Sequence, residues 1–280
     1  MKHLLLALAA VVAVTPAFAA PVVTDMVIEG SQRPIPTTIT LPEGDGPFPF
    51  VVLYHGTGSN RHEAGNGYDL LAPALAEAGI ASARFDFAGN GDSTVDYAEY
   101  TFSSGITDGL DVIAHMRELP QIDDARLGVA GWSQGGTIAM LTAARYPDDV
   151  QSLVTWAGAL DMSGFAPELY EEASKNGTAQ LTFDWREPLN ISKAWFDEAR
   201  STDVAAELAN YDDATLAIAG SNDTVVLPEV AQAILDATGG EPAEVAIIEG
   251  ADHTFNIFSG DMSAFNELIE KTVSWFEATL

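Results

Sequence analysis

The pentapeptide Gly131-Trp132-Ser133-Gln134-Gly135 decides the fold. An apolar run over 126–130, typical of a buried strand, leads into it, and residues 137–146 after it have helical spacing. The pattern G-x-S-x-G between a strand and a helix is typical of a nucleophilic serine on a sharp turn, where only glycine neighbours fit. The alternative is an ordinary glycine-rich loop in which Ser133 only caps the helix.

Strand-length apolar runs alternate with segments of helical period on both sides of this motif. The expected strands cover 22–29, 35–41, 50–54, 80–85, 126–130, 150–156, 215–219 and 244–248. The expected helices cover 67–78, 106–119, 137–146, 229–237 and 264–278. This alternation predicts an α/β protein with a mostly parallel central sheet, helices on both faces and the first two strands as an antiparallel edge.

The alternation breaks between about 159 and 210, where acidic residues and aromatic side chains gather. The aromatic residues are Phe165, Tyr170, Phe183, Trp185, Trp195 and Phe196. We interpret this segment as a cap insertion after the sixth strand of a single domain that spans 20–280. The aromatic side chains either wall a substrate pocket or simply pack the cap onto the core.

Composition excludes several function classes. The 280 residues include 12 basic and 41 acidic side chains and no cysteine, with a formal net charge of -29. Such a chain lacks the clustered Lys and Arg that nucleic acid or an anionic membrane surface requires. It has no thiolate metal site and no twelve-residue calcium loop, so we expect neither a metal nor a cofactor. The oligomeric state is not encoded in any of these patterns.

The first 19 residues have the features of a cleavable signal peptide. Lys2 gives a positive start, Leu4 to Val14 is an uninterrupted apolar run, and Ala17-Phe18-Ala19 offers a small-x-small cleavage site. The apolar run is too short for a membrane span, which takes about 20 residues. We therefore expect a secreted or periplasmic protein without a membrane span.

A serine hydroxyl needs a general base, and His253 is the best candidate. It follows the last expected strand, which satisfies the chain order serine, acid, histidine of one class of triad enzymes. The other histidines lie upstream of the serine, in the signal peptide, an expected helix or loops: His3, His55, His62 and His115.

Asp223 is the expected third member of the triad. It follows the strand at 215–219, where the acid that orients the imidazole should lie. Asp212 and Asp213 precede that strand and so belong to the opposite edge of the sheet. Asp252 is adjacent to His253, but neighbouring side chains on an extended loop point apart.

An oxyanion hole requires two backbone N–H groups near the serine. Gln134, directly after the nucleophile, supplies one, and Thr57 in the loop His55-Gly56-Thr57-Gly58 supplies the other. The segment 85–93 carries a G-x-G pattern without a third glycine or a P-loop lysine. We expect it to shape a loop beside the site rather than to hold a phosphate.

These motifs together resemble the α/β-hydrolase superfamily, and more narrowly the bacterial carboxylesterases of the cinnamoyl or feruloyl esterase group. The motifs are HGTGSNR at 55–61, GIASARFDFAGNGDS at 79–93, GWSQGG at 131–136, GSNDTVV at 220–226 and EGADHTF at 249–255. The resemblance implies Ser133, Asp223 and His253 as the triad, and Thr57 and Gln134 as the oxyanion donors. The chain has Trp132 where the family often has a histidine.

The expected function is a secreted serine esterase acting on a small-molecule ester. Phenolic or short-chain acyl esters are the expected substrates, cleaved through an acyl-enzyme on Ser133. A serine peptidase or an acyltransferase on the same scaffold would pass through the same intermediate and is the alternative. A binding protein that kept the fold without catalysis is a third possibility.

Overall fold

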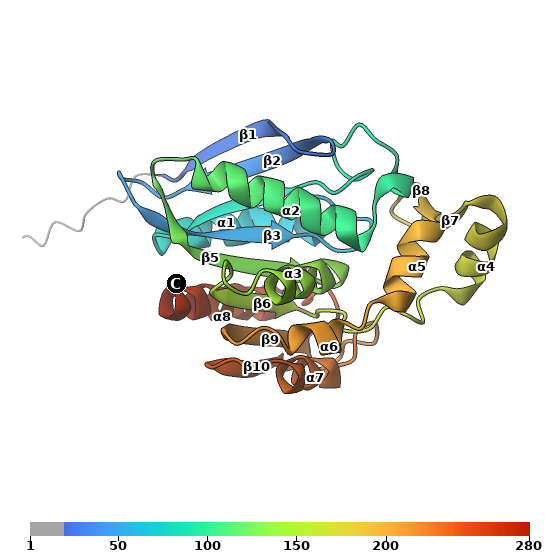
Figure 1. The fold of residues 1–280 in the computed structure, drawn as a ribbon. Coiled ribbons are helices and arrows are strands. Elements are labelled where there is room, and N and C mark those ends of the chain that lie inside the picture. The colour runs from blue at the N-terminus through green and yellow to red at the C-terminus, as the bar shows by residue number, and fades with distance from the viewer. Residues whose placement is uncertain (1–19) are drawn as a thin grey trace, which may run out of the picture.

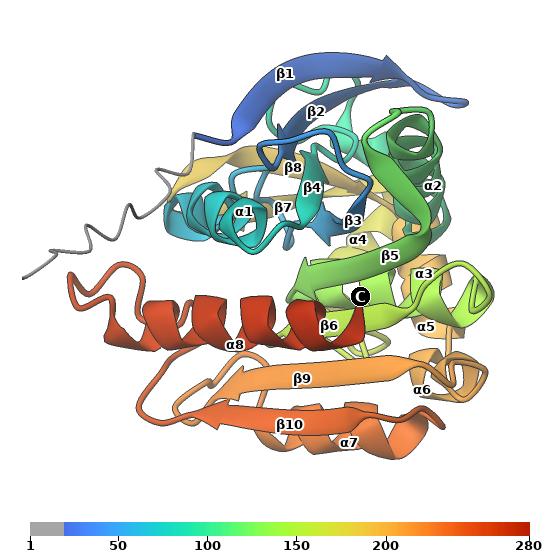
Figure 2. The same cartoon turned by 90° about the vertical axis from the view of Figure 1, so that its left-hand side faces the viewer.

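Figures 1 and 2 show the computed structural model of the protein, which describes residues 20–280. The expected signal peptide, 1–19, lies outside the described residues. Among the residues that are described, no helix is long and apolar enough to cross a membrane.

An eight-stranded sheet forms the centre of the molecule, in the order β1-β2-β4-β3-β5-β6-β9-β10. Its strands are β1 (Val22–Glu29), β2 (Pro34–Leu41), β3 (Phe48–Tyr54), β4 (Ala81–Phe85), β5 (Ile122–Trp132), β6 (Ser152–Trp156), β9 (Ala214–Gly220) and β10 (Ala243–Ile248). The pairs β1–β2 and β2–β4 are antiparallel and all others are parallel. The predicted sheet with its antiparallel edge is confirmed.

Helices cover both faces of this sheet, as the alternation predicts. Residues of α1 and α8 pack with one face, and residues of α2, α3 and α7 pack with the other; Figure 2 shows α8 running alongside β9. The helices are α1 (Gly67–Glu77), α2 (Phe102–Arg117), α3 (Gln134–Arg145), α4 (Pro167–Asn176), α5 (Lys193–Ser201), α6 (Val204–Leu208), α7 (Glu229–Ala237) and α8 (Ser263–Thr279), with short 3-10 turns at Ala64–Asn66 and Tyr97–Glu99.

The parallel strands place the candidate site residues at one edge of the sheet. Tyr54 pairs with Gly131, and Trp132 pairs with Trp156. Since these pairs lie at the carboxyl ends of their strands, the loops that follow begin side by side. Thr57, Ser133, Asp223 and His253 all belong to loops that leave this edge.

The chain between β6 and β9 forms α4, α5, α6 and a separate hairpin of β7 (Thr178–Phe183) and β8 (Arg186–Ser192). Figure 1 shows α4, α5, β7 and β8 grouped beyond one end of the large sheet. Trp195 and Phe196 are fully buried against the main core, so they pack the segment in place. That residues 159–210 act as a cap stays a prediction.

Asp108 on α2 is a buried acid that should make stability depend on pH. It is 0% exposed, and its ion-pair partner is Arg33 at 3.5 Å. Burial raises the pKa of Asp108 to about 7, against the charge of Arg33. A folded-state pKa above the unfolded one means that this group stabilises the fold below about pH 4 and that the stabilisation is lost as pH rises towards 7.

We therefore expect Asp108→Asn to remove part of the pH dependence of folding. Asparagine cannot ionise. The unfolding free energy of the variant minus that of the wild type should therefore rise by about 3 kcal/mol from pH 5 to pH 8. Urea unfolding of both proteins across this range measures the difference. Stability curves that stay parallel from pH 5 to pH 8 would show that Asp108 titrates normally.

Candidate active site

Ser133 lies on a strained turn between β5 and α3. Its backbone has φ 55 and ψ −119, a conformation that non-glycine residues rarely adopt and that costs about 1–3 kcal/mol. The flanking glycines are required, since a Cβ on Gly135 would lie 2.0 Å from the Tyr54 carbonyl oxygen, and one on Gly131 would lie 2.1 Å from the Gly135 carbonyl oxygen. This geometry favours a nucleophile at the sheet edge over a simple helix cap; the Ser133 side chain makes no capping hydrogen bond.

Asp223 and His253 are brought together from separate loops. His253 Nδ1 lies 2.7 Å from Asp223 Oδ2, and the carboxylate is buried. The other oxygen, Oδ1, accepts the N–H groups of Val225 and Val226 at 2.8 and 2.9 Å. Because an ionised carboxylate only accepts, we assign the imidazole proton to Nδ1. His253 Nε2 is then left with a lone pair, as a general base requires.

Asp252, the rival acid, turns away from the imidazole. Its Oδ1 accepts the backbone N–H groups of Thr254 and Asn256 at 2.8 and 3.0 Å. Asp252 therefore shapes the loop that carries His253. Asp223 is the acid that contacts the ring.

The indole of Trp132 ties the histidine loop to the serine turn. Trp132 Nε1 donates to the His253 carbonyl oxygen at 3.1 Å, and its ring packs edge-on against Phe255. Trp132 directly precedes Ser133, so this bond connects the histidine loop to the end of β5 that carries the serine. In the sequence Trp132 stands out only as a departure from the resembled family, and no local pattern indicates a contact over 121 residues.

Within residues 20–280, the hydrogen bonds include none between Ser133 Oγ and the His253 ring. Catalytic hydrogen bonds of this kind often tighten only in the complex with substrate. The structure thus brings acid and base into contact and places the serine on the neighbouring turn, without closing the last bond.

The two candidate oxyanion donors belong to the Ser133 turn itself and to the loop beside it. Gln134 is the first residue of α3, where helix amides have no partner within the helix. Thr57 follows Gly56, and a Cβ on Gly56 would lie only 3.6 Å from Ser133 Cβ. Within the described part of the chain, neither the Thr57 nor the Gln134 amide donates to another protein group. Both are therefore available to an oxygen bound above Ser133.

His55 is a neutral, structural histidine. Its Nε2 accepts the N–H of Phe87 at 3.1 Å, so we assign the proton to Nδ1, which then donates to the Gly56 carbonyl oxygen at 2.9 Å. Burial lowers the pKa of His55 to about 4. Since the carbonyl and the next N–H of one peptide unit point in opposite directions, His55 fixes the direction of the Thr57 N–H.

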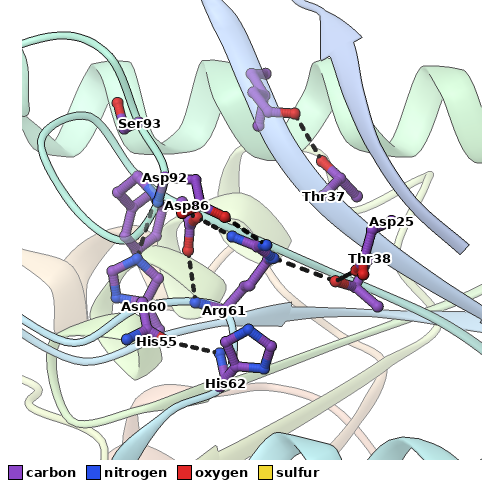
Figure 3. Close-up of polar contacts among 12 residues, drawn as sticks. Asp25, Thr37, Thr38, His55, Asn60, Arg61, His62, Asp86, Asp92 and Ser93 are labelled. Carbon is purple, nitrogen blue, oxygen red and sulfur yellow. Dashed lines mark hydrogen bonds and ion pairs between the residues drawn. The ribbon is translucent and has the colours of Figure 1, made fainter.

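Figure 3 shows how the loop that carries Thr57 is anchored to the loop after β4. Asp86, buried, binds the backbone N–H of Arg61 at 2.7 Å and its guanidinium group, which also binds Asp92 at 2.7 Å. A Cβ on Gly91 would lie 2.2 Å from the Asp86 carboxylate. The glycine of the 85–93 motif therefore makes room for this ion pair, in agreement with its expected role as a loop beside the site.

The β7–β8 hairpin contacts the same loop from outside. The Phe183 ring lies 2.7 Å from the position of a Cβ on Gly58, and Arg186 Nη1 donates to the Gly58 carbonyl oxygen and, at 2.8 Å, to Asn90 Oδ1. Trp185 at the tip is 64% exposed and packs on Phe183. Phe183 thus packs partly against the main core and contacts the loop that carries Thr57, whereas Trp185 remains exposed.

Comparison with known proteins places the chain among hydrolases. Residues 46–196 match the family model Hydrolase_4, described as serine aminopeptidase, S33. Curated relatives include 2,6-dihydropseudooxynicotine hydrolase of Paenarthrobacter nicotinovorans, 29% identical over 49% of this chain. Another is the pimeloyl-[acyl-carrier protein] methyl ester esterase of Neisseria meningitidis, 40% identical over 37% of this chain. The chain spans about a third of the length of these two relatives, 35% and 34%.

Solved structures share the whole fold. The ferulic acid complex of Est1E from Butyrivibrio proteoclasticus has a TM-score of 0.70 at 20% identity, over 90% of this chain and 96% of that one. DcsB in complex with a substrate analogue has a TM-score of 0.77 at 15% identity, over 92% of this chain and 100% of that one. At these identities the likeness establishes the α/β-hydrolase fold alone.

Proposed function

Because the chain belongs to the Hydrolase_4 family (serine aminopeptidase, S33), we propose that it is a secreted serine hydrolase that cleaves carboxylic esters through an acyl-enzyme on Ser133. The observation that carries the proposal is the 2.7 Å contact between His253 Nδ1 and the buried Asp223 carboxylate, next to the strained turn of Ser133. Secretion rests on the signal-peptide pattern of residues 1–19.

The proposed reaction has two halves. Ser133 Oγ attacks the ester carbonyl carbon while His253 Nε2 takes its proton, and the N–H groups of Thr57 and Gln134 stabilise the negative oxygen. The C–O bond to the alcohol then breaks, and the alcohol leaves with the proton from His253. A water molecule, deprotonated by His253, then attacks the acyl carbon. The bond from that carbon to Ser133 Oγ breaks, His253 returns the proton to Oγ, and the free acid leaves.

Phenolic or short-chain acyl esters are the proposed substrates. Phe183 and Trp185 support an aromatic acyl group, because the Phe183 ring lies beside Gly58 in the loop that carries Thr57 and Trp185 packs on that ring. Bound ferulic acid in the structural neighbour Est1E and the methyl ester named for the Neisseria relative agree with ester chemistry.

A serine peptidase is the second candidate, since the matched family is described by a serine aminopeptidase. An amide substrate passes through the same acyl-enzyme with an amine as the leaving group. The two functions differ in the leaving group that the site accepts.

A substrate panel tests the proposal and separates the two candidates. We expect the purified protein to hydrolyse nitrophenyl esters of short acids and methyl hydroxycinnamates, with kcat/KM at least a hundredfold above that for aminoacyl nitroanilides. If the aminoacyl nitroanilides were cleaved faster than every ester, the peptidase would be favoured. Absence of turnover on all of them would contradict hydrolysis.

A further inference from the structure

Glu63 is a buried carboxylate beside the site that the proposed reaction does not use. Its side chain is turned inward, with 8% of the residue exposed, and its backbone has φ 62, in the left-handed region. Such a conformation costs about 1–3 kcal/mol for a residue with a side chain. The rest of the fold therefore holds Glu63 in place at a cost.

Both oxygens of Glu63 accept backbone N–H groups. Oε1 accepts the N–H of Ala64 at 2.9 Å, which caps the short turn that follows. Oε2 reaches seven residues back and accepts the N–H of Gly56 at 2.5 Å. Capping alone explains only the first bond, so the second calls for a separate role.

The second bond falls where the loop touches the nucleophile. A Cβ on Gly56 would lie 3.3 Å from the Trp132 carbonyl oxygen and 3.6 Å from Ser133 Cβ. Burial raises the pKa of Glu63 above the ordinary carboxyl range, whereas hydrogen bonds from Ser59, Gly56 and Ala64 and the charge of His253 oppose that rise. The carboxylate thus lies within electrostatic reach of the general base and one residue from Thr57.

We propose that Glu63 is a positioning residue for the oxyanion hole. Its carboxylate holds Gly56 by the N–H, while His55 Nδ1 holds Gly56 by the carbonyl oxygen. The bond to Glu63 fixes the His55–Gly56 peptide unit and the bond to His55 fixes the Gly56–Thr57 peptide unit. Together they set the backbone conformation of Gly56 and aim the Thr57 N–H at the substrate oxygen. This inference rests on the proposed function.

The hydrogen-bonding geometry of a carboxylate suits this role, whereas its negative charge does not. It accepts at both oxygens, which an amide side chain cannot do. Its negative charge lies near the developing oxyanion and would oppose it, so charge alone would not select an acid here. The benefit of the acid is therefore the oriented hydrogen bond that it accepts from the Gly56 N–H.

The variant Glu63→Gln tests this inference with little change in shape. Its amide nitrogen must face either Gly56 or Ala64, so one of the two N–H groups loses its acceptor. Loss of one oxyanion donor costs about 10²–10³ in kcat, and a displaced donor should cost about 10–100-fold. We expect this fall in kcat per active site, counted by phosphonate titration, with KM changed less than twofold.

The inhibition constant of a transition-state analogue is a second measurement, which should not change if Glu63 served only to stabilise the fold. A trifluoromethyl ketone forms a hemiketal with the serine and presents its oxygen to the oxyanion hole. Its inhibition constant should rise by the same factor as kcat falls. The control Asp203→Asn removes a carboxylate that accepts the Ala206 N–H at the start of α6, and should leave kcat and the inhibition constant unchanged.

The outcomes separate this inference from the function on which it rests. If the wild type turns over esters and Glu63→Gln keeps its kcat per site and inhibition constant within twofold, the inference is wrong and the function stands. If the wild type neither turns over esters nor binds the ketone, the proposed function fails first. Should Glu63→Gln not fold, Glu63→Asp takes its place, since the shorter carboxylate retracts from Gly56 and should give the same paired loss.

Discussion

Replacing Ser133 by alanine should abolish ester hydrolysis, with kcat reduced by about 10⁴–10⁶-fold. No other hydroxyl occupies the strained turn at the end of β5, and the Oγ atom is the one that forms the acyl bond in the proposed reaction. The alanine variant keeps φ 55 without strain beyond that of serine, so its unfolding free energy should change by less than about 1 kcal/mol. Stopped-flow or steady-state release of nitrophenol from a short-chain ester measures the loss.

Ser274→Ala is the matched control for this loss. Ser274 lies on the exposed side of α8, so its hydroxyl should be dispensable and turnover should equal that of the wild type. If Ser133→Ala retained more than a hundredth of the wild-type turnover, another nucleophile would have to carry the reaction.

Replacing Asp223 by asparagine should reduce kcat by about 10³–10⁴-fold. Asparagine Oδ1 can still accept the N–H groups of Val225 and Val226, so the loop should keep its shape. Its Nδ2 would then face His253 Nδ1 across 2.7 Å, which drives the imidazole proton to Nε2. A histidine in that tautomer cannot take the proton of Ser133.

The variant Asp252→Asn distinguishes the role of Asp252 from that of Asp223. Asp252 binds Thr254 and Asn256 rather than the imidazole, so this variant should keep kcat within about tenfold of the wild type. Equal losses in the two variants, each corrected for the folded fraction by circular dichroism, would contradict the assignment of Asp223.

Much of the fold was predictable because the hydrophobic periodicity of short segments indicates most of its strands and helices. The buried run at Phe48–Tyr54 and the helical spacing after Ser133 indicate their elements directly. Boundaries were less predictable. Helix α2 begins at Phe102, since Thr101 and Ser104 form a capping box, whereas the apolar period alone pointed to residue 106. The β7–β8 hairpin was missed because it forms a two-stranded sheet apart from the central one, and its buried side chains pack beside α4 and the 3-10 turn at Tyr97–Glu99.

The candidate site was predictable as far as chain order determines it. Ser133, Asp223 and His253 each follow a strand, and parallel strands bring the ends of their loops to one edge. The supporting contacts were not predictable. The Trp132 indole on the His253 carbonyl and the Arg186 side chain on Gly58 join residues more than a hundred positions apart. No residue type or spacing marks such pairs.

Covalent labelling with a nitrophenyl phosphonate, read by mass spectrometry of the intact chain and of its peptides, tests most directly whether Ser133 is the nucleophile. One adduct per chain is expected, formed with loss of one nitrophenolate, on the peptide that contains Ser133, and absent from Ser133→Ala. An adduct on any other peptide, or continued ester turnover by a chain that takes up no label, would contradict it.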